Sequence, residues 1–176
     1  GDKDRLMSYS ADVDNRIVAI SDPNYPAASN AQETATLPDL ATSTENAQQC
    51  SAGSQGWKSI LAKGVIPASS PILGYKNIFT TLYRPRAEAA CEFGNSQVQI
   101  NDYRCGTLRQ SIDLGSGVAT QATLHRGRVY IGLADNGQAL DLPAGWERVG
   151  SLVIGVLPNT EDFVKEPLKI RGWWSN

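Results

Sequence analysis

The most chemically reactive side chains are few in this chain of 176 residues, which contains three cysteines and a single histidine. His125 lies beside Arg126 in a predicted tight turn, where an imidazole is solvated. One histidine excludes zinc sites that need two, and the cysteine spacing matches no Cys-x-x-Cys site. No Gly-x-Ser-x-Gly sequence surrounds a serine, and no Gly-x-Gly-x-x-Gly or Walker loop is present. The sequence therefore predicts a chain that is not an enzyme.

Two of the cysteines bracket a short loop between strand candidates. We expect Cys91 and Cys105 to form a disulfide, which would restrict the unfolded chain and stabilise the fold by on the order of 3 kcal/mol. The alternative is a set of three reduced thiols in a cytosolic protein. The low lysine content and the Ser-, Thr-, Asn- and Gln-rich composition instead favour a secreted β-protein. Cys50 is then left over, either free or paired with another part of a longer protein.

Two groups of acidic residues offer oxygen atoms to a calcium ion: Asp12 with Asp14, and Asp135 with Asp141. After the first group, an EF-hand would need an oxygen-bearing residue at Arg16 and a glycine at Ile17, so the pattern fails at both. Asp and Asn are also common in turns, because their side chains cap backbone amides. Turn chemistry is therefore favoured over calcium at both places, and no other cofactor is expected.

Length and composition indicate one domain over residues 1–176. With 41% hydrophobic residues the chain can bury a core, and a formal charge of −2 gives no basic surface for nucleic acid. No apolar run reaches the roughly 20 residues that span a bilayer. Gly1 opens directly on charged residues without a signal peptide, which predicts a mature chain or a fragment of a longer one.

Alternating apolar and polar residues predict strands along most of the chain. Asn136-Gly137 is a strong hairpin signal between two of them. The run 151–157 is almost continuously apolar, as in a strand buried on both faces. Few segments show a helical period, so the predicted fold class is all-β. The expected strands are 5–10, 16–21, 56–61, 71–83, 97–100, 108–114, 118–124, 128–133, 138–142, 151–157 and 168–174.

Residues 22–55 form a long polar segment with almost no large apolar side chains. Such a segment buries too little surface to offset its ordering entropy, so we expect a surface insertion within the domain. This insertion would contain one short helix after Pro38, over residues 39–49. A functional lid is the alternative, and a solvated loop is favoured over it.

A strand, an Asp/Asn turn and a second strand occur at residues 6–20 and again at residues 128–142. Repeated antiparallel units are typical of β-propellers, whose blades have about four strands and 40–50 residues. This chain can supply roughly three such blades, whereas a closed ring needs at least four. The prediction is a partial or modified β-propeller of about three antiparallel blades.

The order of landmarks from Gly56 onward resembles the C-terminal β-propeller of PilY-type proteins, the tip-associated adhesins and assembly factors of type IV pili. The matching landmarks are Gly56-Trp57, Leu61, Gly64, Pro71, Phe79-Thr80-Thr81, Pro85, Cys91, Gly94, Gly127-Arg128-Val129-Tyr130, Asp135-Asn136-Gly137 and Ile170-Arg171-Gly172-Trp173-Trp174. The chain departs from the family pattern at Gly64-Val65-Ile66-Pro67, where the family has Gly-Glu-Arg-Val. The segment after Cys91 also contains fewer glycines than the family pattern has there. The family's calcium loop is not found.

The resemblance implies a non-enzymatic component of the pilus machinery that promotes assembly and surface adhesion at the pilus tip through protein–protein contacts. Its partners would be minor pilins or other tip proteins, and a host or abiotic surface. It would reach the cell surface through the periplasm. The alternative is a secreted carbohydrate-binding or quinoprotein-like propeller module. A self-contained β-sandwich in a cell-surface array is a third hypothesis.

The four tryptophans divide into two kinds. Trp57 and Trp146 each follow a glycine in a strand context and are expected to pack one blade against the next. Trp173 and Trp174 are adjacent on a predicted strand, so their side chains point to opposite faces. Either both sheet faces are covered there, which is the favoured interpretation, or one tryptophan is exposed. An exposed tryptophan would mark an interface with a partner, since aromatic residues are enriched in binding hot spots.

Overall fold

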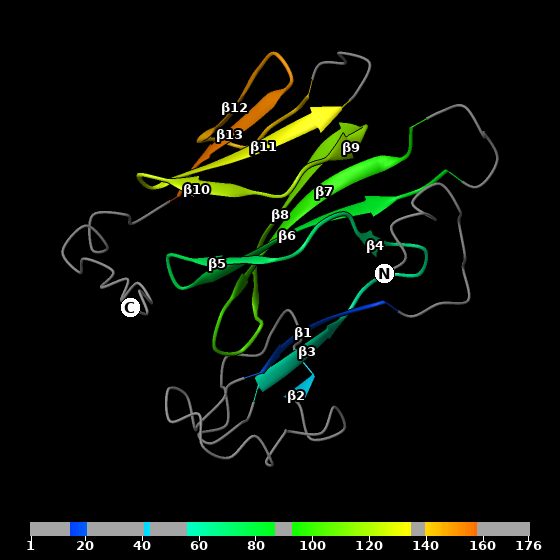
Figure 1. Cartoon of the computed structure of the whole chain (residues 1–176), viewed down its shortest axis with the longest axis vertical. Helices are drawn as coiled ribbons and strands as arrows, with labels where there is room; N and C mark the ends of the chain where they lie inside the picture. Colours follow the sequence, from blue (N-terminus) through cyan, green and yellow to red (C-terminus); the bar gives the residue numbers. More distant parts are fainter. Residues whose placement is uncertain (1–14, 21–40, 43–55, 87–92, 135–139, 158–176) are drawn as a thin grey trace, which may run out of the picture.

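The structure is a computed structural model that describes residues 15–20, 41–42, 56–86, 93–134 and 140–157. Within these ranges the chain forms thirteen strands in three sheets and contains no helix (Figure 1). Accordingly, no described helix is long and apolar enough to cross a membrane. The all-β prediction is confirmed.

The three sheets follow one another along the sequence. The N-terminal sheet has the order β1 (Arg16–Ile20), β3 (Gly56–Ile60), β2 (Ala41–Thr42). The central sheet has the order β4 (Ile66–Pro67), β6 (Asn77–Arg84), β7 (Asn95–Asp102), β8 (Leu108–Ser116), and β5 (Ile72–Gly74) also pairs with β6. The C-terminal sheet has the order β10 (Thr123–His125), β11 (Arg128–Ala134), β13 (Leu152–Val156), β12 (Trp146–Val149), and β9 (Val118–Ala119) also pairs with β11. Every pair is antiparallel except β2 with β3.

The central sheet lies between the other two (Figure 1). One core fills the space toward the C-terminal sheet, and a second, smaller core fills the space toward the N-terminal sheet. Strand β6 serves both, because successive side chains of a strand point to opposite faces: Phe79 packs in the first core and Leu82 in the second. Three stacked, mainly antiparallel sheets are compatible with a partial β-propeller of about three blades.

One tryptophan packs in each of the two cores, as the sequence predicts. Trp57 is 1% exposed in the smaller core, and its indole Nε1 donates a hydrogen bond to the Tyr103 carbonyl oxygen at 2.9 Å. Trp146 lies across the backbone of its cross-strand partner Gly155. A Cβ atom at that glycine would stand 2.5 Å from the indole ring, so only glycine leaves room for the ring.

The strand predicted over residues 71–83 is wrong as a single element, because the chain turns back at Tyr75 and Lys76 to form the β5–β6 hairpin. Both residues have positive φ angles, 51° and 56°, the signature of a tight hairpin turn usually built from Gly or Asn. The turn is stabilised by Asn77, whose Nδ2 donates to the Tyr75 carbonyl oxygen at 2.7 Å. The run 118–124 is likewise divided, into β9 and β10.

The hairpin predicted between β11 and residues 138–142 is also wrong over its described part, since Leu140 to Leu142 form no strand. One edge of β11 is occupied by β9 and β10, and the other by β13, so no edge remains for another strand. Leu140 and Leu142 pack against the larger core instead. Residues 135–139 lie outside the described part of the chain.

Two further expectations are corrected. Strand β13 is buried on one face only: Val153 is 0% exposed, whereas Leu152 and Val156 are 36% and 50% exposed. Ala41–Thr42, expected within a short helix, form a strand that pairs with β3. The rest of the polar segment 22–55, and the strands expected at 5–10 and 168–174, lie outside the described residues.

Candidate functional site

A cleft of about 340 Å³ lies where β6 ends and β7 begins. Its walls come from the central sheet and from the segment that leads into β4. The lining residues are Val65, Tyr83, Arg84, Pro85, Arg86, Asn95, Ser96, Gln97 and Asp113.

Local sequence explains why this end of the sheet is open. Pro85 has no backbone N–H and ends β6, so the exposed Arg84 and Arg86 stand on either side of a buried proline. Strand pairing brings in the polar groups opposite, since Asn95 pairs with Arg84 and Gln97 pairs with Asp113. The cleft is therefore lined by two guanidinium groups, one carboxylate and two side-chain amides.

Hydrogen bonds fix the walls of this cleft. The Tyr83 hydroxyl accepts a hydrogen bond from the Gly94 backbone N–H at 2.9 Å. The Ser96 hydroxyl donates to the Gly117 carbonyl oxygen at 2.7 Å and accepts from the Ala119 N–H at 3.1 Å. Tyr83 is 1% exposed, so the one aromatic ring among the lining residues presents no face for stacking. The arrangement is suited to holding a polar or charged group by hydrogen bonds.

A second organised place is the turn between β7 and β8. Two backbone hydrogen bonds close it, from the Gly106 N–H to the Asp102 carbonyl oxygen at 2.9 Å and from the Asp102 N–H to the Thr107 carbonyl oxygen at 2.8 Å. The Asp102 carboxylate accepts from the backbone N–H of Arg104 at 2.9 Å and of Cys105 at 3.3 Å, and from the Arg109 guanidinium.

These contacts set the charge of Asp102. Burial alone raises the pKa of a carboxyl group. Here the hydrogen bonds from Arg109 and from the two backbone amides outweigh burial and hold the pKa of Asp102 below its ordinary value. The carboxylate is therefore ionised and serves as a fixed acceptor for the turn.

The same turn carries Cys105, which is held in a disulfide. The partner expected from the sequence, Cys91, lies outside the described residues, and so does Cys50. The Cys91–Cys105 pair therefore stays a prediction.

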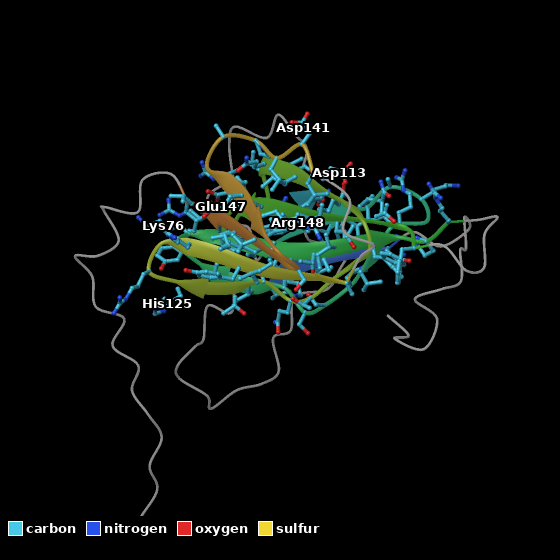
Figure 2. The ribbon with its side chains drawn as sticks, turned by 90° about the horizontal axis from the view of Figure 1, so that it is seen from above. Lys76, Asp113, His125, Asp141, Glu147 and Arg148 are labelled. Atoms are coloured by element: carbon cyan, nitrogen blue, oxygen red, sulfur yellow. The ribbon has the colours of Figure 1, made fainter. Side chains whose placement is uncertain are left out.

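The other residues singled out from the sequence do not come together. Asp12, Asp14 and Asp135 lie outside the described residues, as do Trp173 and Trp174. Asp141 is exposed, and it and His125 project from opposite sides of the molecule (Figure 2). Among the described residues, no group of three or more His, Cys, Asp or Glu side chains is placed to hold a metal ion.

Sequence reasoning missed both the cleft and the Asp102–Arg109 pair. The pair had a local signal, because Asp102 ends an alternating run and an arginine follows seven residues later. The cleft had only the Arg84-Pro85-Arg86 sequence, since its other walls depend on strand register. Comparisons of the chain with protein-family models, with curated proteins and with solved structures find no match.

Proposed function

We propose that this chain is a non-enzymatic component of the type IV pilus machinery that promotes pilus assembly and surface adhesion at the pilus tip through protein–protein contacts. The proposal rests on the resemblance to the PilY-type propeller. The observation that supports it is the position of the matching landmarks in the three sheets. Gly56-Trp57 opens β3, Phe79-Thr80-Thr81 forms the middle of β6, and Gly127 to Tyr130 leads into β11, so each landmark belongs to a strand of a different sheet.

The outer face of the C-terminal sheet supports a role in protein contacts. Val149 and Leu152 are cross-strand partners, and Val156 lies four residues along the same face as Leu152. Their exposed fractions are 59%, 36% and 50%. Exposed apolar side chains that gather on one sheet face favour contact with another protein. We assign this face, called the apolar face below, to minor pilins or other tip proteins.

The disulfide at Cys105 supports the proposed location. Disulfides persist in the periplasm and outside the cell, and they are rare in the reducing cytosol. An extracellular position on the pilus, reached through the periplasm, agrees with this chemistry.

The experiment uses a bacterium that carries the gene encoding this chain and that assembles type IV pili. The double variant Val149→Lys, Leu152→Lys places two charges on the apolar face, at side chains that are 59% and 36% exposed. We expect at least a tenfold reduction in the amount of minor pilins that co-purify with the tagged protein, together with fewer surface pili and weaker adhesion.

Ile60→Lys is the matched control, because Ile60 is 53% exposed on the N-terminal sheet, away from the apolar face. This variant should retain normal piliation. Normal piliation after in-frame deletion of the whole chain would contradict the proposed function. Turnover with an added quinone, or specific binding on a glycan array, would instead support the carbohydrate-binding or quinoprotein-like alternative.

A further inference from the structure

The partner of Cys105 can be inferred from the described residues around it. Cys105 is held in a disulfide, and the chain has two other cysteines, Cys50 and Cys91. Cys105 lies in the closed turn at one end of the β7–β8 hairpin, three residues after β7 ends at Asp102. The length of chain between described residues decides which of these two cysteines can reach the β7–β8 turn.

In the sequence, Cys91 comes shortly before the described residues at the opposite end of β7. It precedes by three residues Gly94, whose N–H donates to the Tyr83 hydroxyl and whose carbonyl oxygen accepts from the Gly117 N–H at 2.9 Å. Three residues reach at most about 11 Å. From Gly94 to Asp102 the strand runs roughly 26 Å in the other direction, at about 3.3 Å per residue.

Even if the chain before Gly94 folded straight back, the Cα atoms of Cys91 and Cys105 would stay roughly 15 Å apart. Local twist and the two register shifts in β7 shorten this separation by only a few ångströms. A disulfide needs Cα atoms about 4.4–6.8 Å apart. Cys91 of the same chain is therefore out of reach.

In the sequence, Cys50 comes shortly before a strand of the N-terminal sheet. It lies six residues before Gly56, where β3 begins, and six residues span up to about 20 Å. The residue after Gly56, Trp57, donates a hydrogen bond from its indole to the Tyr103 carbonyl oxygen. Because Tyr103 lies two residues before Cys105, the start of β3 is in direct contact with the turn. Figure 1 shows the β7–β8 turn beside the start of β3.

We propose that Cys105 pairs with Cys50, in place of the Cys91 pairing expected from sequence spacing, and that Cys91 keeps its thiol. The bond would tie the segment that precedes β3 to the central sheet. Its formation breaks two S–H bonds and forms one S–S bond. The two protons and two electrons pass to a disulfide oxidant, either glutathione disulfide or the disulfide form of a thiol–disulfide oxidoreductase, whose S–S bond is reduced to two thiols.

Trypsin separates the three cysteines, because each lies on its own peptide: residues 17–58, 87–104 and 105–109. The full chain is refolded with glutathione disulfide, alkylated with iodoacetamide, digested without reduction and measured by mass spectrometry. We expect peptide 17–58 linked to peptide 105–109, and peptide 87–104 alkylated. Reduction before alkylation should release the linked pair.

Three outcomes would overturn the proposal: peptide 87–104 linked to 105–109, two copies of 105–109 linked to each other, or 105–109 recovered as an alkylated thiol. Variants provide a second measurement. Cys91→Ser should keep the linked pair and should leave no reactive thiol in the native protein. Cys50→Ser should lose the link and expose two reactive thiols. A link that survives Cys50→Ser would contradict the assignment.

Discussion

Asp102 shows how one side chain can organise a turn that local sequence only suggests. Its carboxylate accepts hydrogen bonds from Arg109 and from the backbone N–H groups of Arg104 and Cys105. Arg104 in turn donates through Nε to the Tyr103 hydroxyl at 2.9 Å, which raises the pKa of the arginine. Because Tyr103 also accepts from Trp57, this turn is linked to the core behind it.

Replacement of Asp102 by asparagine should remove the charge and keep one acceptor oxygen. We expect the free energy of unfolding at pH 7 to fall by about 1 kcal/mol, because hydrogen bonds to an ionised group are worth more than neutral ones. The loss stays this small because Arg109 is largely exposed, and solvent screens its attraction to the carboxylate. Urea unfolding measures the change. Asp141→Asn, which removes an exposed carboxylate elsewhere, is the control and should change stability by less than about 0.5 kcal/mol.

The pH dependence of this difference follows from the lowered pKa of Asp102. The unfolded carboxyl group titrates near 3.9, and the folded one titrates lower. The stabilisation is therefore fully present above about pH 4 and is lost as the pH falls through the folded pKa. Wild type and Asp102→Asn should converge in stability below that pKa. A difference that stays constant from pH 7 to pH 2 would show that the charge has no part in it.

At the scale of elements, strands with a local boundary signal were predictable. Strand β6 ends before Pro85, and β11 begins after the Arg126-Gly127 turn, as the sequence suggests. The turn at Tyr75 and Lys76 could not be predicted, because neither residue type favours a positive φ angle. A distant contact helps to hold it: the Tyr75 hydroxyl accepts from the Gly127 N–H at 2.8 Å, across 52 residues.

The cleft could not be predicted for a related reason. Arg84 and Asp113 line the same cleft although they lie on β6 and β8, with β7 between them. Register brings them there, and β7 shifts register between Ser96 and Gln97 and again between Ile100 and Asn101. A one-residue shift moves side chains to the opposite face, and the alternating pattern does not locate such irregularities.

Strand β6 offers a matched pair of substitutions. Thr80 and Thr81 are 0% and 1% exposed, yet only Thr81 has a hydrogen-bonded hydroxyl, 2.6 Å from the Ser69 hydroxyl, whereas the Thr80 hydroxyl has no partner among the described residues. Thr80→Val should raise the free energy of unfolding by up to about 1 kcal/mol, because it removes a buried unsatisfied polar atom.

Thr81→Val should lower the free energy of unfolding by about 1 kcal/mol, because it leaves Ser69 without that partner. Both variants keep the β-branched shape that suits a strand, so each serves as the control for the other in thermal and urea unfolding. Equal effects of the two substitutions would show that the hydrogen bond to Ser69 does not contribute.

At the scale of the whole molecule, the three sheets depend on one another through the central one. The larger core joins the central and C-terminal sheets with side chains from both. The smaller core joins the N-terminal sheet through a handful of residues, of which Trp57 is the largest. A stack of this kind leaves its outermost sheet faces open to partners, which is where the proposed function places pilin contacts.

Loss of Trp57 should therefore loosen one sheet more than the others. Trp57→Phe keeps most of the packing and removes the hydrogen bond to Tyr103, so we expect a loss of about 1 kcal/mol. Trp57→Ala should cost about 3–5 kcal/mol. In native-state hydrogen exchange, the amides of β1 and β3 should lose protection in Trp57→Ala before those of β7 and β11, because local opening follows the contacts that remain.

Trp146→Ala is the matched control for that experiment, because Trp146 packs in the core between the central and C-terminal sheets. Its loss of protection should centre on β12 and β13 and leave β1 and β3 unchanged. If Trp57→Ala instead lowered protection uniformly in all three sheets, the stack would be a single cooperative unit. The N-terminal sheet would then be as firmly integrated as the other two.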